Sequence, residues 1–197
     1  CIEAAQELSQ VGNGECIALP GNISSMDEIH ALVAALKERE TSIDVLVNNA
    51  GVGWLAPLED FPEAGWDKVM DLNVKTPFFL TRELAPLLSA GASHENTASV
   101  INIGSIAGIA AATDTFSYAP SKAAIHQVTR NLAVALADQH IRAHLNRLGR
   151  MPRRANRRHT FQASPFDFLD DLRRRPASIG QSLNVIIDTH VDYALNA

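Results

Sequence analysis

The stretch Asn102-Ile103-Gly104-Ser105, with Tyr118-Ala119-Pro120-Ser121-Lys122 a short distance downstream, decides which fold this sequence predicts. Residues 100–103 are rich in β-branched side chains, a pattern typical of a buried strand. Ser105 falls where that strand would end. An Ala-, Gly- and Thr-rich loop follows, and a helix is expected to begin near Pro120, because the missing N–H of proline costs nothing in a first helical turn. The stretch therefore predicts a strand, a loop and a helix in succession.

Three side chains of this stretch suit proton exchange. Tyr118 and Lys122 are four positions apart, so on a helix they share one face. An ammonium beside a phenol stabilises the phenolate and lowers the pKa of the phenol, which can then exchange a proton near neutral pH. The Ser105 hydroxyl, at the carboxyl end of a parallel strand, would point into the crevice where α/β sheets bind ligands. The alternative is a surface tyrosine, a solvated lysine and a turn-capping serine, because Tyr-x-x-x-Lys alone is a common spacing.

Other motifs, in chain order, favour the first interpretation. The full set is Asn48-Asn49-Ala50-Gly51 after a strand, Asn73 in a long helix, Ser105 after the next strand, then Tyr118 and Lys122. At these residues the chain resembles the short-chain dehydrogenase/reductase family, over about residues 1–142. Residues 100–109 look most similar to the β-ketoacyl reductases, especially the type linked to rhamnolipid synthesis.

This resemblance implies a Rossmann-like, doubly wound parallel sheet and an NAD(P)-dependent oxidoreductase. Such an enzyme transfers hydride between a nicotinamide and a carbonyl or alcohol substrate. The similarity to ketoreductases makes a 3-oxoacyl compound the candidate substrate. In these roles Tyr118 would donate the proton, Lys122 would lower the Tyr118 pKa and bind the nicotinamide ribose, and Ser105 would hydrogen-bond the substrate oxygen. Asn73 would help to hold a water in the proton relay. Taken in isolation, Asn73 would more often be a surface residue.

The resemblance also assigns cofactor contacts, with NADP(H) favoured over NAD(H). The assigned residues are Asn22, Asn49, Ala50, Gly51, Tyr118 and Lys122. Small residues in the Asn-Asn-Ala-Gly segment would let a cofactor approach the backbone, although these four residues alone could equally form a simple turn. Asn22 stands where the family usually has an aspartate near the adenine.

Composition limits the class of protein further. The 197 residues suit one domain, and a hydrophobic share of 46% is typical of a soluble globular protein. No apolar run approaches the roughly 18–20 residues of a membrane span, and no secretory signal is visible at the start. Cys1 and Cys16 are too few for a disulfide framework, and no metal site is expected. We expect a cytoplasmic protein that acts on a small molecule; by resemblance it would be a homodimer or homotetramer whose two long helices pack against their copies.

Periodicity predicts alternating helices and strands, and hence a parallel sheet. Helices are expected over residues 1–10, from Ser24 or Ser25 onward, from about Gly65 or Trp66 to Leu88, and from about Pro120 to Asp138. Strands are expected at residues 16–19, 43–47 and 100–103, with a further candidate at residues 183–187.

The front of the chain departs from the family pattern. The family begins with a strand and a glycine-rich turn that holds the pyrophosphate. Gly12-x-Gly14 follows a helix, so it lacks the required context. We therefore expect an incomplete sheet without the first two strands and that turn. The strand near Ile17 would lose its neighbour, and buried sheet edges would be left unpaired.

The back of the chain departs as well. All four lysines lie before residue 123, whereas the basic residues after Gln139 are all arginines. We therefore divide the chain into a partial Rossmann-like domain, 1–142, and an atypical arginine-rich tail, 143–197, that is disordered or derives from a shifted reading frame. Sequencing the transcript across the Arg142 codon tests the second idea, which an intact frame would end.

These departures leave two further functional alternatives. The chain could be a catalytically inactive fragment that retains only the helix-mediated dimer interface. The arginines could instead track nucleic-acid phosphates, but acidic residues near them dilute the charge, so nucleic acid is the less favoured partner.

Overall fold

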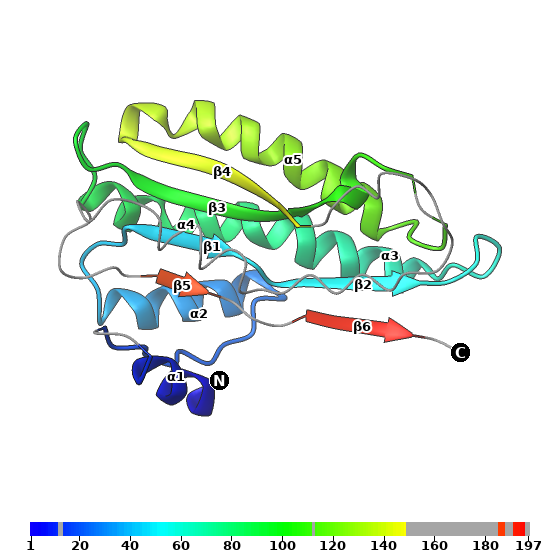
Figure 1. Ribbon diagram of the computed structural model, residues 1–197, viewed down its shortest axis with the longest axis horizontal. Coiled ribbons are helices and arrows are strands. Elements are labelled where there is room, and N and C mark those ends of the chain that lie inside the picture. The colour runs from blue at the N-terminus through cyan, green and yellow to red at the C-terminus, as the bar shows by residue number, and fades with distance from the viewer. Residues whose placement is uncertain (12–13, 112, 149–184, 188–190, 196–197) are drawn as a thin grey trace.

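The computed structural model describes residues 1–11, 14–111, 113–148, 185–187 and 191–195. The central sheet has the strand order β4-β3-β1-β5, and every neighbouring pair is parallel (Figure 1). Its strands are β1 (Val45–Asn48), β3 (Ala98–Ser105), β4 (Ile141–Leu148) and β5 (Val185–Ile187). A second, two-stranded parallel sheet joins β2 (Gly51–Leu55) to β6 (Val191–Leu195).

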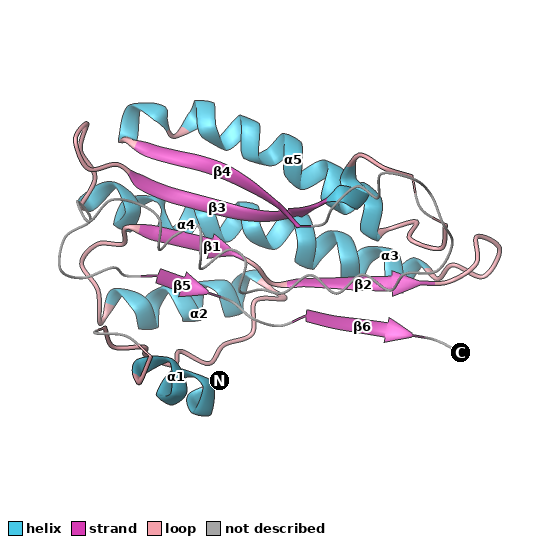
Figure 2. Cartoon of the chain, in the orientation of Figure 1, coloured by secondary structure: helices cyan, strands magenta, loops and turns pink. Residues whose placement is uncertain are grey.

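Helices alternate with the strands, so the predicted α/β class with a parallel sheet is confirmed (Figure 2). They are α1 (Ile2–Ser9), α2 (Met26–Lys37), α3 (Glu63–Met70), α4 (Thr76–Ala90) and α5 (Tyr118–Ala135). Short helical turns occupy η1 (Asp71–Lys75), η2 (Ile106–Gly108) and η3 (Ala137–Gln139). No helix in the described part of the chain has both the length and the apolar character needed to cross a bilayer.

Strand β4 runs across the expected boundary at Arg142. It pairs with β3 along its whole length, from the partners Ala98 and Ile141 to the partners Ser105 and Leu148. The ordered sheet therefore continues past residue 142. Residues 149–184, which hold most of the arginine-rich stretch, lie outside the described residues. The predictions of disorder, a shifted frame or nucleic-acid contacts there stay predictions.

The edge of β1 that faces away from β3 is paired, contrary to the expectation of an open edge. Val45, Leu46 and Val47 pair with the three residues of β5, which confirms the strand expected near residues 183–187. Backbone N–H and C=O groups at a sheet edge need partners, and a segment late in the chain supplies them here.

The strand expected at residues 16–19 is wrong. These residues form no strand and pair with none of the described strands. A short apolar run has no strand structure of its own until a neighbour accepts its backbone hydrogen bonds. Ser9 provides a substitute, because its hydroxyl accepts from Cys16 N at 2.8 Å and lies 3.2 Å from Cys16 O.

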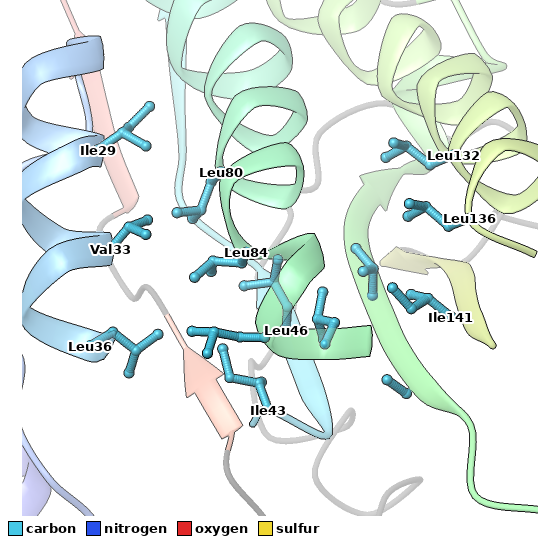
Figure 3. Close-up of a cluster of buried hydrophobic side chains, with 14 of the residues drawn as sticks. Ile29, Val33, Leu36, Ile43, Leu46, Leu80, Leu84, Leu132, Leu136 and Ile141 are labelled. Atoms are coloured by element: carbon cyan, nitrogen blue, oxygen red, sulfur yellow. The ribbon is translucent and has the colours of Figure 1, made fainter. Parts of the chain in front are cut away.

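Helices α2, α4 and α5 form an apolar core with one face of the sheet (Figure 3). The labelled side chains are Ile29, Val33 and Leu36 from α2, Leu80 and Leu84 from α4, Leu132 and Leu136 at the end of α5, and Ile43, Leu46 and Ile141 from the sheet side. Side chains alternate along strands, so a smaller cluster of Val45, Val47, Ile101 and Ile103 lies on the opposite face. The two clusters fix the register of β1 against β3.

The long helix expected up to Leu88 is one helical segment from Glu63 to Ala90, interrupted at η1 by a π-helical turn. In this turn Thr76 N–H bonds the carbonyl of Asp71, five residues back. Pro77 comes next and has no N–H to donate, which favours a change of hydrogen-bond register at this point. Turns of this kind are frequent at functional sites, and Asn73 lies inside this one.

Helix α2 begins as the sequence predicts. Ser25 is its N-cap and accepts from Glu28 N, while the Glu28 carboxylate accepts from Ser25 N at 3.1 Å. Hydrogen bonds from Ser24 and Ser25 lower the pKa of the Glu28 carboxyl. This reciprocal capping box satisfies two backbone donors at the helix start.

Candidate active site

Ser105 ends β3 and caps the 3₁₀ turn η2. Its hydroxyl accepts a hydrogen bond from Ala107 N at 3.1 Å, and the residue is half-buried. The pairing of β3 with β4 stops at Ser105. Two residues later, the Ala107 N–H donates to the serine hydroxyl and not to a neighbouring strand. The serine hydroxyl therefore stands at the carboxyl end of a central parallel strand, where α/β sheets bind ligands.

The turn that follows Ser105 packs directly on helix α5. A Cβ placed on Gly108 would lie 2.8 Å from the backbone carbon and oxygen of Lys122 and 2.9 Å from Ala123 N. Glycine is required for this approach, because any side chain would push the two backbones apart. Gly108 thus fixes the distance between the Ser105 turn and the first two turns of α5.

Tyr118 and Lys122 lie on those turns. The Lys122 Nζ atom donates to the carbonyl of Ile103 at 2.8 Å and lies 5.7 Å from the centre of the Tyr118 ring. Lys122 is only 6% exposed, and burial lowers its pKa to about 8. The ammonium is thus held between the phenol and the strand residue two positions before Ser105, as the helical spacing predicts.

Asn73 is buried, at 2% exposure, which excludes the surface alternative. Its Oδ1 accepts from Val52 N at 2.9 Å, and its Nδ2 donates to Val52 O at 2.9 Å and to Ser121 Oγ at 3.0 Å. The side chain imitates a strand partner for β2 and at the same time reaches α5. The π-helical turn places it at the point where η1, β2 and α5 meet.

A second buried amide network lies deeper in the sheet. Asn48 and Asn102 are register partners on β1 and β3, and Asn48 Nδ2 donates to Asn102 Oδ1 at 2.8 Å. Asn48 Nδ2 also lies 3.1 Å from Thr81 Oγ1 on α4, and Asn102 Nδ2 donates to Thr129 Oγ1 on α5 at 2.9 Å. The network ties both central strands to both long helices just before the strands end.

The predicted cofactor residues fall into two groups. Gly51 borders the site, because a Cβ there would meet Asn73 Oδ1 at 3.3 Å and Lys122 Nζ at 3.7 Å. Ala50 lines a cavity of about 10 Å³, room for about one water, and Asn49 is half-buried between them.

Asn22 stands apart from this group. It is exposed, and its amide donates to Glu28 Oε1 at 2.6 Å, within the cap of α2. The next residue links this loop to the site, because Ile23 O accepts from Thr76 Oγ1 at 2.9 Å and Ile23 lines the same cavity as Ala50.

A nicotinamide nucleotide is the group that the site implies. The Lys122 ammonium carries three N–H groups, and Ile103 O is its one hydrogen-bond acceptor among the described residues. A buried ammonium with spare donors fits ribose hydroxyls. The residues therefore fit the nicotinamide half of the cofactor.

The sequence prediction missed Ser121, the backbone of Val52, and Asn102. Ser121 lies three residues after Tyr118 and one before Lys122, so helical spacing already placed it on the inner face. Asn102 interrupts a β-branched run, as Asn73 interrupts an apolar helix. A polar residue in such a position was the sequence signal that could have identified Asn102 as a site residue. No pattern in the sequence predicts the contact with Val52, because Val52 contributes only its backbone N–H and C=O to it.

A parallel α/β sheet that presents these groups at its carboxyl edge defines a Rossmann-like domain. A family model described as short chain dehydrogenase matches residues 1–157, so the chain belongs to the short-chain dehydrogenase family.

Two curated proteins with similar sequences show which members of the family this chain resembles. The rhamnolipids biosynthesis 3-oxoacyl-[acyl-carrier-protein] reductase of Pseudomonas aeruginosa is 46% identical over 158 residues, which are 80% of this chain and 61% of that protein. An NAD-dependent glycerol dehydrogenase of Listeria innocua is 33% identical over 68% of this chain and 51% of its own length. The chain thus spans about three fifths or less of these relatives.

Solved structures agree with this placement. The Pseudomonas aeruginosa RhlG/NADP active-site complex matches with a TM-score of 0.73 and 46% identity, over 77% of this chain and 59% of that one. An NADH-dependent reductase A1-R' complexed with NAD matches with a TM-score of 0.68 and 34% identity, over 74% and 61%. The described fold is therefore that of enzymes solved with either dinucleotide.

Proposed function

We propose that this chain carries the catalytic half of an NAD(P)-dependent oxidoreductase that interconverts a carbonyl and an alcohol. The buried Lys122 ammonium, held at 2.8 Å from the carbonyl of Ile103 and 5.7 Å from the Tyr118 ring, carries the proposal. A buried charge is costly, so a buried ammonium beside a phenol at the carboxyl edge of a parallel sheet marks a candidate reaction site.

The proposed roles follow from position. The bound nicotinamide supplies the hydride that reaches the carbonyl carbon. Tyr118 donates its phenolic proton to the carbonyl oxygen, and the Lys122 ammonium favours the phenolate that remains. The Ser105 hydroxyl donates a hydrogen bond to the same oxygen and polarises the carbonyl. Lys122 also holds the nicotinamide ribose through the N–H groups that Ile103 does not use.

Asn73 completes the proposed proton path by holding a water near Lys122. Its side chain is fully engaged with Val52 and Ser121, so its backbone carbonyl would accept from that water. Pro77 supports this role, because in an α-helical register it is the residue that would bond the Asn73 carbonyl, and it has no N–H.

The substrate and the preferred dinucleotide are part of the same proposal. A 3-oxoacyl thioester is favoured as substrate, because the relative with 46% identity is a 3-oxoacyl reductase by name. NADP(H) is favoured over NAD(H), because the similar structure with 46% identity is described as an NADP complex, although others are described with NAD or NADH. Asn49, Ala50, Gly51 and Asn22 would lie along the dinucleotide.

The test of the proposal uses Tyr118→Phe. The purified chain is titrated with NADPH and with NADH by fluorescence, and reduction of acetoacetyl-CoA is followed at 340 nm. We expect tighter NADPH binding, and turnover that falls by roughly a thousandfold in the variant while binding stays unchanged. Retained turnover in the variant would refute the role of Tyr118.

An inactive fragment of such an enzyme is the second candidate, and the observation behind it is that the chain spans 61% of the 3-oxoacyl reductase relative. It predicts no saturable binding of either dinucleotide to the purified chain. The fluorescence titration therefore separates the two candidates before any turnover is measured.

A homo-oligomer formed through the two long helices, in the cytoplasm, completes the proposal. Phe78 on α4 is 41% exposed and Val134 on α5 is 81% exposed, so both helices keep large apolar side chains on their outer surfaces. Sedimentation equilibrium is expected to give a dimer or tetramer, and Val134→Glu is expected to weaken it. A monomer at all concentrations would contradict this part.

A further inference from the structure

The hydroxyl of Ser121 lies between the backbone carbonyl of Tyr118 and the side chain of Asn73. Ser121 is completely buried, and its Oγ donates to the Tyr118 carbonyl at 2.7 Å while it accepts from Asn73 Nδ2 at 3.0 Å. The same helical turn carries Tyr118 and Lys122. One small hydroxyl therefore connects the turn that presents both groups to the π-helical turn.

The Asn73 amide explains why this connection is specific. Its two N–H groups have two acceptors, Val52 O and Ser121 Oγ, and its oxygen accepts from Val52 N. The carboxamide is thus locked in one orientation, with β2 on one side and α5 on the other. Loss of the Ser121 hydroxyl would leave a buried N–H without an acceptor, and the helix turn would be free to shift.

A small shift of this turn would matter because the neighbouring contacts are tight. The Gly51 backbone approaches both Asn73 and Lys122, and the Gly108 backbone abuts the carbonyl of Lys122. We propose that Ser121 is a positioning residue that, through Asn73, sets the place of the Tyr118 phenol relative to the Lys122 ammonium. The inference rests on the proposed oxidoreductase function only for its consequence in turnover.

Thr129, two turns further along α5, provides a matched control. Its hydroxyl donates to the Ile125 carbonyl at 2.7 Å and accepts from Asn102 Nδ2 at 2.9 Å. The chemistry is the same as that of Ser121, a buried hydroxyl that bonds its own helix and a buried asparagine amide. Thr129 differs in that it does not lie between Tyr118 and Lys122.

The experiment reads the phenol directly. The chain has two tyrosines, Tyr118 and Tyr193, so Tyr193→Phe leaves Tyr118 as the only phenol. Absorbance near 295 nm is followed against pH in this background, alone and with Ser121→Ala, Ser121→Thr or Thr129→Val. We expect Ser121→Ala to raise the midpoint of phenol ionisation by roughly half a pH unit or more, because the phenolate and the ammonium stabilise each other as a pair and the pair loses its alignment.

The controls separate positioning from packing. Ser121→Thr keeps the hydroxyl and is expected to restore the midpoint, whereas Thr129→Val is expected to leave it unchanged although it loses an equivalent hydrogen bond. Equal midpoints for Ser121→Ala and the parent, or equal shifts for Ser121→Ala and Thr129→Val, would overturn the proposal. If Ser121→Ala does not fold, Ser121→Cys keeps the volume with weaker hydrogen bonding and is subject to the same comparison.

Turnover gives a second reading if the parent chain is active. Ser121→Ala is then expected to lower kcat by roughly tenfold to a hundredfold with little change in KM for NADPH. A parent chain without turnover would argue against the proposed function, and the phenol titration would still decide the role of Ser121.

Discussion

Two buried layers lie on the same face of the sheet, and they are held together by different kinds of contact. The apolar layer is the cluster made by α2, α4, α5 and the middle of the strands, with Leu46, Leu84 and Leu88 at its centre. The polar layer lies at the carboxyl ends of the strands. It consists of Asn48, Asn73, Thr81, Asn102, Ser121, Lys122 and Thr129, all buried and each with a hydrogen-bond partner.

Stability and function are divided between these two layers. Contacts in the apolar layer are non-directional, so many packings of similar volume would satisfy them. Each contact in the polar layer needs one orientation, because a buried donor without an acceptor is costly. The apolar layer therefore stabilises the fold, and the polar layer holds the site in one arrangement at some cost in stability.

The largest expected effect breaks the apolar layer. Leu84→Ala removes a side chain that is 1% exposed and is expected to lower the free energy of unfolding by about 3–5 kcal/mol. Urea unfolding at pH 7 measures it. Leu58→Ala is the matched control, because Leu58 is 70% exposed and the same change there should cost less than about 0.5 kcal/mol. Similar costs at both positions would mean that the layer is not close-packed.

The next largest effect is expected when the charge of the polar layer, the Lys122 ammonium, is removed. The pKa of Lys122 falls from its usual 10.5 to about 8 in the folded chain, so between these values the unfolded chain binds more protons and stability rises with pH. Below pH 8 the buried ammonium costs roughly 3 kcal/mol.

Lys122→Met should therefore stabilise the chain at pH 7, by less than that amount because the Ile103 carbonyl loses its donor. Urea unfolding from pH 7 to 11 should also lose the rise between pH 8 and 10.5 that the parent shows. A variant that keeps the parent's slope would show that Lys122 is not the titrating group.

A smaller effect tests the contact that joins the Ser105 turn to α5. Gly108→Ala places a methyl group 2.8 Å from the Lys122 backbone and is expected to cost about 1–3 kcal/mol. Gly14→Ala is the matched control, because nothing lies within 4 Å of a Cβ there. Thermal unfolding of the two variants compares them. Equal midpoints would show that the turn can move without cost.

The smallest effect on the free energy of unfolding is expected outside both layers, at the N-cap of α2. Ser25→Ala removes the N-cap of α2 and should cost about 1 kcal/mol, because Glu28 N loses its acceptor. Ser24→Ala also removes a hydrogen bond to Glu28 but caps no backbone donor, so it should cost less. The ratio of the two values in urea unfolding measures the cap itself, and the reverse order would contradict the capping box.

Much of the fold could be predicted from the sequence. The helices near residues 1–10, 26–37 and 118–135 and the strands that end at Asn48 and Ser105 follow from local periodicity and capping signals. Strands β2 and β6 were missed, and the strand at residues 16–19 was wrong, because strand formation depends on which neighbour is present.

The candidate site divides in a similar way. Helical spacing alone places Tyr118 and Lys122 on one face, and the folded chain brings the phenol and the ammonium together as expected. Spacing gives no measure of burial, so neither the 6% exposure of Lys122 nor its lowered pKa could be predicted. The double contact of Asn73 with Val52 and Ser121 joins segments that are 21 and 48 residues away along the chain.

The helices, the strands that end at Asn48 and Ser105, the family resemblance and the order of the reactive side chains could be read from the sequence, because these depend on residue identity and on spacings within one helix or strand. The tertiary structure alone decided that Asn73 is buried in a π-helical turn, that β5 closes the edge of β1, and that Lys122 is desolvated. Those properties belong to groups from distant segments, and hydrogen bonds and desolvation act only once the folded chain brings the groups into contact.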